Sequence, residues 1–410
     1  MRTSPAGQSE GRTMRFAEFV AFIAACMALN ALAIDVMLPA LPAITAAFGL
    51  DDANHAQAVV AVYLVGMGVS QLFYGPLSDR YGRRPVLIAG LGLFAAAGLL
   101  SAMSMSFGTL LVARVAQGLG AGAPRVIASS LARDLYADRQ LGRVLSLAMT
   151  FFMAVPILAP SIGQLILAFA PWRWTFGALV VGGLVMLLWS LWRLEETLPA
   201  SLRRPLSVTA ILGGYRATFC TRAAFSYMLA LGLVIGAQMG FILSAQRIFS
   251  EIFAAGAAFG PLFALVAAAM AVAAFVNSRL VLRLGMRRLA LTGLSILVVL
   301  NLLHLAIAWR TGEPLWAFML MQMGSMAMFG FLGANLSALS IAPFGHMAGT
   351  ASSAIGWFTT MLGAGLGFMV GQAFDGTVLP LTGAYAALGA MAWALVLRAE
   401  HKSSRSRRLG

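Results

Sequence analysis

Long apolar segments recur along the whole chain, and they constrain its fold more than any other feature. A helix needs about 20 predominantly apolar residues to cross the roughly 30 Å hydrocarbon core of a bilayer. Twelve segments of suitable length lie at 16–38, 55–77, 85–104, 107–131, 143–169, 173–193, 223–246, 255–277, 288–309, 315–339, 348–373 and 380–398. The sequence therefore predicts an all-α membrane protein with twelve transmembrane helices.

The composition excludes a water-soluble protein of this size. Hydrophobic residues make up 60% of the 410 residues and charged residues only 10%, whereas about a quarter of an average soluble domain is charged. The net charge is +14, but the sequence lacks the basic clusters interleaved with aromatic residues that are typical of nucleic-acid binders. No nucleic-acid partner is therefore expected. The expected partner of most of the surface is the lipid bilayer.

Lys and Arg are distributed unevenly between the segments that link the spans. If the amino terminus is cytoplasmic, 23 of the 28 basic residues fall in cytoplasmic segments and three in outer segments, while Arg114 and Arg125 lie within a span. Cytoplasmic loops of membrane proteins carry an excess of Lys and Arg. The sequence therefore predicts that both termini are cytoplasmic and that the number of spans is even.

A polar break divides the spans into two sets of six. The turn after the second span contains Gly82, and the turn after the eighth contains Gly285, an offset of 203 residues that is close to half of the chain. Duplicated bundles are typical of transporters, so we expect two pseudo-symmetric six-helix bundles. The expected regions are a cytoplasmic N-terminal segment (1–15), an N-terminal bundle (16–194), a cytoplasmic central loop (195–221), a C-terminal bundle (222–398) and a basic cytoplasmic tail (399–410).

The turn after the second span combines one acidic residue with three basic ones. It reads Gly75-Pro-Leu-Ser-Asp79-Arg80-Tyr-Gly82-Arg83-Arg84. Gly82 permits the strained backbone of a tight turn, and the three Arg favour the cytoplasmic face. Asp79 can pair with a neighbouring Arg or lie against the amino terminus of another helix. The segment is either a latch that forms and breaks between two conformations or a basic loop that sets topology.

The same segment resembles the signature that the Major Facilitator Superfamily carries between its second and third helices. Similarity to the Bcr/CflA subfamily of drug:proton antiporters extends over Ala33-Ile34-Asp35-Val-Met-Leu38-Pro39, Arg114-Val-Ala-Gln117-Gly118, Arg133-Asp134-Leu-Tyr136, Ala159-Pro160-Ser-Ile-Gly163 and Ala348-Gly349-Thr350-Ala351-Ser352-Ser353. The chain has Asp35-Val36-Met37 where members commonly have Asp-Met-Tyr. The resemblance implies the major facilitator fold, in a bacterial inner membrane.

The resemblance also implies a set of gating residues. Arg83 would pair with Asp134, and Asp79 would lie near the start of the eleventh span at Ala348. Pro and Gly residues of the fifth span would let that helix bend and pack closely, although ordinary Gly and Pro usage in membrane helices explains them equally well. The expected gating residues are Gly75, Asp79, Arg80, Gly82, Arg83, Arg84, Asp134, Pro156, Pro160 and Gly163.

Two charged residues inside spans are the candidates for proton coupling. Asp35 is the only carboxylate well inside a predicted span. An ionised group there costs at least about 2.5 kcal/mol on insertion scales, so Asp35 is the expected proton carrier unless it forms a permanent ion pair or is exposed at its helix end. The resemblance implies that Arg114 senses or assists this proton transfer; alternatively, Arg114 binds backbone carbonyls across helices. Arg125 is either a helix-end anchor or a cation in the cavity.

The substrate-binding residues are expected to face a central cavity between the two bundles. The offset of 203 residues places Gln238 opposite Asp35. A run of Met at 319–328 suits a pocket for varied apolar molecules, or else packing and lipid contact. The expected substrate-binding residues are Asp35, Gln238, Gln322, Met323 and Asn335.

No catalytic constellation, metal-ligand cluster or phosphate-binding loop is present in the sequence, so we expect no enzyme activity and no cofactor. Transport energy would come from the proton gradient. We expect a monomeric antiporter that exports small amphipathic compounds and confers antibiotic resistance. A proton-coupled carrier of one metabolite, in either direction, and a non-transporting membrane scaffold or sensor are the alternatives.

Overall fold

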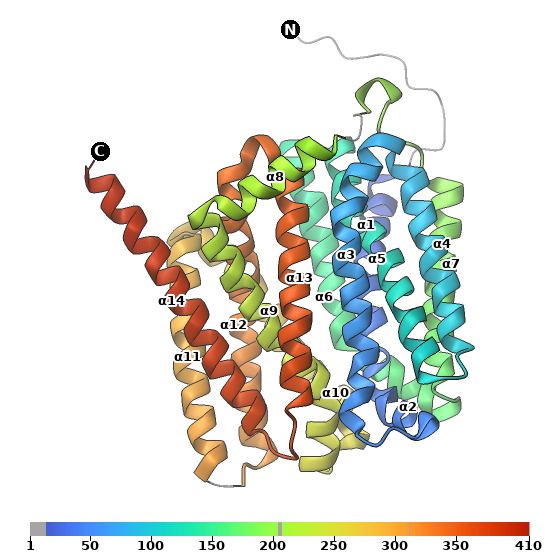
Figure 1. Ribbon diagram of the computed structural model, residues 1–410, viewed down its shortest axis with the longest axis vertical. Coiled ribbons are helices and arrows are strands. Elements are labelled where there is room, and N and C mark those ends of the chain that lie inside the picture. The colour runs from blue at the N-terminus through green and yellow to red at the C-terminus, as the bar shows by residue number, and fades with distance from the viewer. Residues whose placement is uncertain (1–13, 204–206, 311, 410) are drawn as a thin grey trace.

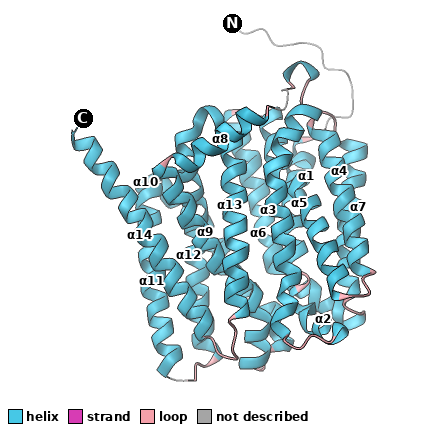
Figure 2. Ribbon diagram, viewed as in Figure 1, coloured by secondary structure: helices cyan, strands magenta, loops and turns pink. Residues whose placement is uncertain are grey.

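A computed structural model describes residues 14–203, 207–310 and 312–409, and within these ranges the chain contains helices and loops only (Figures 1 and 2). The expected N-terminal segment falls largely outside the described residues. Six long helices form the first half: α1 (Phe16–Asp35), α3 (Ala58–Tyr81), α4 (Arg83–Ala102), α5 (Phe107–Leu135), α6 (Asp138–Phe169) and α7 (Arg173–Arg193). Six more form the second: α9 (Arg222–Arg247), α10 (Phe259–Leu284), α11 (Met286–Arg310), α12 (Leu315–Ile341), α13 (Ala348–Gln372) and α14 (Leu379–Leu409).

Short elements connect the long helices. These are η1 (Leu38–Ala40), α2 (Leu41–Phe48), η2 (Ala53–Gln57), η3 (Ala200–Leu202), α8 (Val208–Cys220), η4 (Ile248–Ile252), η5 (Gly256–Ala258) and η6 (Ala342–Met347). The predicted polar break at 195–221 thus contains a helix of its own, α8, which lies across one end of the bundle (Figure 1). The helix α14 continues beyond residue 398, so the region expected to be a separate tail extends the last helix.

The prediction of twelve membrane helices is confirmed. Eleven helical segments of the described chain are long and apolar enough to cross a membrane. The twelfth long helix, α5, has 29 residues and is more polar because it carries Arg114, Arg125, Arg133 and Asp134. Its length and its position among apolar neighbours place it in the bundle despite those charges.

The long helices stand side by side, and α1 begins and α14 ends at the same end of the bundle, where α8 also lies (Figure 1). We call this the terminal end; the other end, which carries α2, is the opposite end. Across the two halves, α3 packs on α13 and α6 packs on α10. These two contacts join the halves along their length.

Each half is tied together at the terminal end by a polar contact between its first and last helix. In the first half, Arg193 of α7 forms an ion pair with Glu18 of α1 at 2.7 Å. In the second half, the hydroxyl of Tyr227 on α9 donates to Glu400 of α14, which also pairs with Arg287 at 3.2 Å. The repeated arrangement is consistent with two related bundles.

Small residues allow helices to approach closely inside the second half. Gly232, Gly236 and Gly240 recur every four residues on α9, and each faces a branched side chain of α13. Small residues at this spacing are a common interface in membrane helix pairs. The contact fixes α13, which in turn carries the contact to α3.

Candidate functional site

Asp35 lies at the last residue of α1, where the helix breaks before η1. The residue is 5% exposed, and no hydrogen bond or ion pair from the described part of the chain reaches its carboxylate. Burial and the partial negative charge at a helix carboxyl end both disfavour an ionised carboxylate. The site therefore favours a carboxyl group that holds a proton until water or a ligand reaches it.

The break after Asp35 is held by Pro39 and by the close approach of α6. A side chain at Gly163 of α6 would overlap the backbone carbonyl of Val36 and lie 2.8 Å from the ring of Pro39. The prolines of α6 are inside the helix, with Pro160 buried and Pro156 half-buried. Gly163 thus allows α6 to lie directly against the broken segment.

Arg114 is fully buried, and each of its three guanidinium nitrogens donates a hydrogen bond. Nη2 donates to the carbonyl of Ala33 at 2.9 Å, Nε to the carbonyl of Val59 at 3.0 Å, and Nη1 to Gln117 at 2.7 Å. The guanidinium also lies 4.3 Å from the ring centre of Tyr63. Arg114 therefore joins α5 to α1 and α3, and it binds the backbone two residues before Asp35 rather than the carboxylate.

The expected substrate-binding residues of the second half form hydrogen bonds inside their own bundle. Gln238 donates to the sulfur of Met270 at 3.2 Å. Gln322 is fully buried and donates to the hydroxyl of Tyr385 at 3.0 Å. Among the described residues, neither side chain is hydrogen-bonded to Asp35.

Asn335, like Gln238 and Gln322, forms a hydrogen bond inside the second half. It is 2% exposed and donates to Asn277 of α10 at 2.7 Å. Met323 is half-buried on α12. The structure thus places Gln322 in the contact of α12 with α14 and Asn335 in the contact of α12 with α10.

A charged cluster at the terminal end brings together the residues of the turn after α3. Arg83 pairs with Asp79 at 2.5 Å and with Asp134 of α5 at 3.0 Å, and it also donates to Ser78 at 2.7 Å. Gly82 has φ 104°, a conformation that favours glycine. Within the described chain no hydrogen bond joins Asp79 to α13, the helix that the resemblance places beside it.

The remaining residues of this turn have separate contacts. Arg80 is exposed and lies 5.4 Å from the ring centre of Tyr81, and Arg84 donates to the carbonyl of Leu191 at 2.9 Å. A side chain at Gly75 would meet the hydroxyl of Ser353 on α13. Gly75 therefore lies at the contact between the two halves.

Sequence reasoning missed two residues of this cluster, Glu196 and Thr197. Glu196 follows α7 and accepts hydrogen bonds from the backbone N–H groups of Arg83 at 2.8 Å and Arg84 at 3.2 Å, and so caps the start of α4. Thr197 donates to Asp134 at 2.9 Å. An acidic residue just outside a span is a signal for capping a helix amino terminus, but the sequence does not say which helix, since Glu196 lies 113 residues from Arg83.

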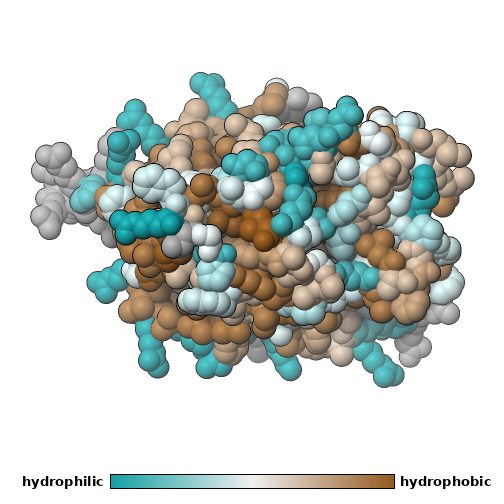
Figure 3. Space-filling view, turned by 90° about the horizontal axis from the view of Figure 1, so that it is seen from below, coloured by the Kyte–Doolittle hydropathy of each residue, from teal (hydrophilic) through white to brown (hydrophobic). Residues whose placement is uncertain are grey.

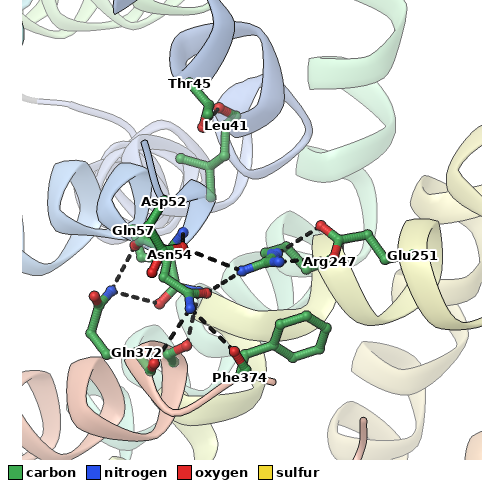
Figure 4. Close-up of polar contacts among 10 residues, drawn as sticks. Leu41, Thr45, Asp52, Asn54, Gln57, Arg247, Glu251, Gln372 and Phe374 are labelled. Carbon is green, nitrogen blue, oxygen red and sulfur yellow. Dashed lines mark hydrogen bonds and ion pairs between the residues drawn. The ribbon is translucent and has the colours of Figure 1, made fainter. Parts of the chain in front are cut away.

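At the opposite end, a second polar cluster joins the two halves (Figure 4). Asn54 of η2 donates to the carbonyls of Gln372 at 3.3 Å and Phe374 at 3.2 Å, and Gln372 donates back to the carbonyl of Asn54 at 2.6 Å. Gln57 donates to the carbonyl of Gly371 at 3.3 Å. These bonds connect the segment before α3 with the end of α13.

Arg247, at the end of α9, completes this opposite-end network. It donates to the side-chain oxygen of Asn54 and pairs with Glu251 at 2.7 Å. Its guanidinium lies 4.4 Å from the ring centre of Phe374. We define the opposite-end network as Asn54, Gln57, Arg247, Glu251 and Gln372.

Another contact between the halves lies near this network. Gln164 of α6 donates to the carbonyl of Gly256 at 2.9 Å and accepts from the backbone N–H of Gly260 at 2.8 Å. On the face at this end, apolar side chains lie between hydrophilic ones (Figure 3).

At the terminal end, the hydroxyl of Tyr215 on α8 donates to the carbonyl of Leu72 on α3 at 2.9 Å. Burial raises the pKa of the Tyr215 hydroxyl. A phenol in this environment keeps its proton, and therefore keeps this hydrogen bond, at neutral pH.

Two helical bundles, a buried carboxyl group at a helix break and a polar contact layer at each end are the features of a secondary transporter of the membrane. A match to the family described as "Major Facilitator Superfamily" covers residues 23–370. The chain belongs to this family. It is a multi-pass membrane protein, and its family membership assigns it to transport rather than to catalysis.

Relatives of the chain include proteins named for drug resistance. The chain is 27% identical over 343 residues to a bicyclomycin resistance protein homolog of Haemophilus influenzae, covering 80% of this chain and 82% of the relative. It is 41% identical over 170 residues to multidrug resistance protein MdtL of Escherichia coli, covering 41% of this chain and 43% of MdtL. The match to MdtL thus spans less than half of either protein.

The fold is also shared with solved structures. The crystal structure of the human organic anion transporter MFSD10 (TETRAN) aligns with a TM-score of 0.69 at 20% identity, covering 94% of this chain and 99% of the other. At this identity the similarity shows the fold alone.

Proposed function

We propose that the protein exports small amphipathic compounds from the cytoplasm of a bacterium in exchange for protons. The observation that carries this proposal is Asp35, a buried carboxyl group at the break in α1 for which residues 14–203, 207–310 and 312–409 supply no counter-ion. A group of this kind inside a membrane bundle is suited to carrying a proton. The similarity to proteins named for bicyclomycin and multidrug resistance supports drugs as substrates.

The distribution of basic residues favours the terminal end as the cytoplasmic side. The opposite-end network then lies on the outer side and holds the halves together there. Export by alternating access requires this network to break when the cavity opens outward. It also requires the charged cluster of Asp79, Arg83 and Asp134 to rearrange when the cytoplasmic side closes. Protonation of Asp35 from the outside would accompany release of the substrate.

Transport in proteoliposomes tests the role of Asp35. The Asp35→Asn variant removes the exchangeable proton and keeps the shape of the side chain, so it should abolish substrate-driven proton movement while the protein remains folded. Asp51→Asn is the matched control, because Asp51 is exposed in the loop after α2 and has no described partner. Coupling at the wild-type level in Asp35→Asn would contradict the proposal.

Resistance profiling separates drug export from transport of a single metabolite. Cells that lack their own pumps and express the protein should tolerate several unrelated amphipathic compounds, and collapse of the proton gradient should remove this tolerance. A requirement for the protein in growth on one compound, without resistance, would favour the metabolite carrier.

A further inference from the structure

Arg125 lies inside α5, and its side chain is exposed although its neighbours on the helix are buried. Ala123, Pro124 and Ile127 are all buried, while Arg125 is accessible. No hydrogen bond or ion pair reaches it from residues 14–203, 207–310 or 312–409. A guanidinium in a membrane helix without a protein partner must contact water or another ligand.

The geometry of α5 directs Arg125 away from the lipid. Val112 is 72% exposed and marks the lipid-facing side of α5. Arg125 follows thirteen residues later, a separation that turns an α-helix by about 220°, so it lies on nearly the opposite side. Arg114 is eleven residues before Arg125, about three helical turns, and therefore shares its face. That face is directed toward α1 and α3, because Arg114 binds the carbonyls of Ala33 and Val59.

No carboxylate of the described chain is placed to neutralise Arg125. Asp35 lies level with Arg114, whose guanidinium binds Ala33, and Arg125 is about 16 Å further along the helix axis toward the terminal end. Asp79 and Asp134 pair with Arg83, and Glu18 pairs with Arg193. The guanidinium keeps its charge at any physiological pH, and no residue of the described chain supplies its counter-ion, so a bound ligand can take that place.

We propose that Arg125 binds an anionic group of the substrate, and that the exported amphipathic compounds therefore include carboxylates. The planar fork of a guanidinium matches a carboxylate with two parallel hydrogen bonds. The inference rests on the proposed export function and adds a substrate class to it. Asp35 and Arg125 then have separate roles. Asp35 exchanges the proton, and Arg125, nearer the terminal end of the bundle, binds the anionic group of the compound.

Uptake by inside-out membrane vesicles with an imposed proton gradient tests this inference. Three probes share one apolar scaffold: 1-naphthaleneacetate, its methyl ester and a naphthylmethyl trimethylammonium. The wild type should take up the acid in preference to the ester. Arg125→Gln should lower uptake of the acid at limiting concentration by about tenfold or more, the loss expected for one charged hydrogen-bonded contact, and should leave the ester unchanged. Arg125→Lys keeps the charge and should retain part of the preference.

The matched control is Arg139→Gln, which removes an exposed charge at the start of α6 and should leave all three probes unchanged. Equal loss of acid and ester in Arg125→Gln would overturn the inference, and so would a wild type that moves the ester or the ammonium but not the acid. The second result is measured on the wild type, so it decides the question even if the variant fails to fold. If the wild type takes up none of the three probes when a proton gradient is imposed, this result would instead refute the proposed function.

Discussion

Arg114 donates to the backbone carbonyl of Ala33 at 2.9 Å, two residues before the carboxyl group of Asp35. The bond joins the second turn of α5 to the last turn of α1. Carbonyls in the last turn of a helix lack intrahelical partners, and here a buried cation supplies one. The position of Asp35 therefore depends on Arg114 without a direct bond between the two side chains.

Replacement of Arg114 by Lys should destabilise the protein and weaken proton coupling. An ammonium group cannot reach Ala33, Val59 and Gln117 together, and each lost hydrogen bond to a charged group is worth about 1.5–3 kcal/mol. We expect a lower thermal unfolding midpoint in detergent and slower substrate-driven proton movement. Arg310→Lys, an exposed change at the end of α11, is the control. An unchanged midpoint would show that these bonds contribute little to stability.

Replacement of Glu196 by Ala should destabilise the start of α4. The side chain accepts from the backbone N–H groups of Arg83 and Arg84, and loss of a helix cap costs about 1 kcal/mol. We expect faster amide exchange in the first turn of α4, measured by hydrogen–deuterium exchange and mass spectrometry. Glu195→Ala is a close control, because Glu195 is exposed and does not cap the helix. Equal exchange in the two variants would contradict the capping role.

The long helices could be predicted from the sequence because a bilayer imposes both their length and their apolar composition. Even α5 was predicted, since two arginines do not remove the apolar character of 107–131. The charged turn was predicted as a unit because Asp79 and Arg83 are four residues apart on the chain. In these cases the structure depends on contacts between residues close in the sequence or on contact with the lipid bilayer.

The contacts between distant segments could not be predicted in the same way. Gln57 and Gly371 are 314 residues apart, and their hydrogen bond depends on how the two bundles dock. The sequence shows polar residues near the ends of two predicted spans but not that they meet. The contact of Gln322 could not be predicted for the same reason. A buried amide on α12 can face either the cavity or α14, and the position of Tyr385 determines which of the two it faces.

Replacement of Asn54 by Ala should favour opening of the opposite end. The side chain of Asn54 donates to the carbonyls of Gln372, the last residue of α13, and of Phe374, and it accepts from Arg247 (Figure 4). Loss of these bonds should weaken the closed arrangement by about 2 kcal/mol, at about 1 kcal/mol or less for each hydrogen bond, which corresponds to a shift of roughly thirtyfold between the two conformations. The backbone carbonyl of Asn54 still accepts from Gln372, so the helices should remain intact.

Spin labels on the two halves measure this shift. Cysteines at Asp51 and Thr377, both exposed at this end, and replacement of the exposed Cys220 by Ser give one labelled pair, since Cys26 is buried. In Asn54→Ala, double electron–electron resonance should show a larger fraction of long distances between the two spin labels than in the parent. His55→Ala is the control, because His55 is the next residue, is exposed, and has no described bond across the halves. The network would have no role in closing the outer side if Asn54→Ala and His55→Ala gave the same distance distribution as the parent.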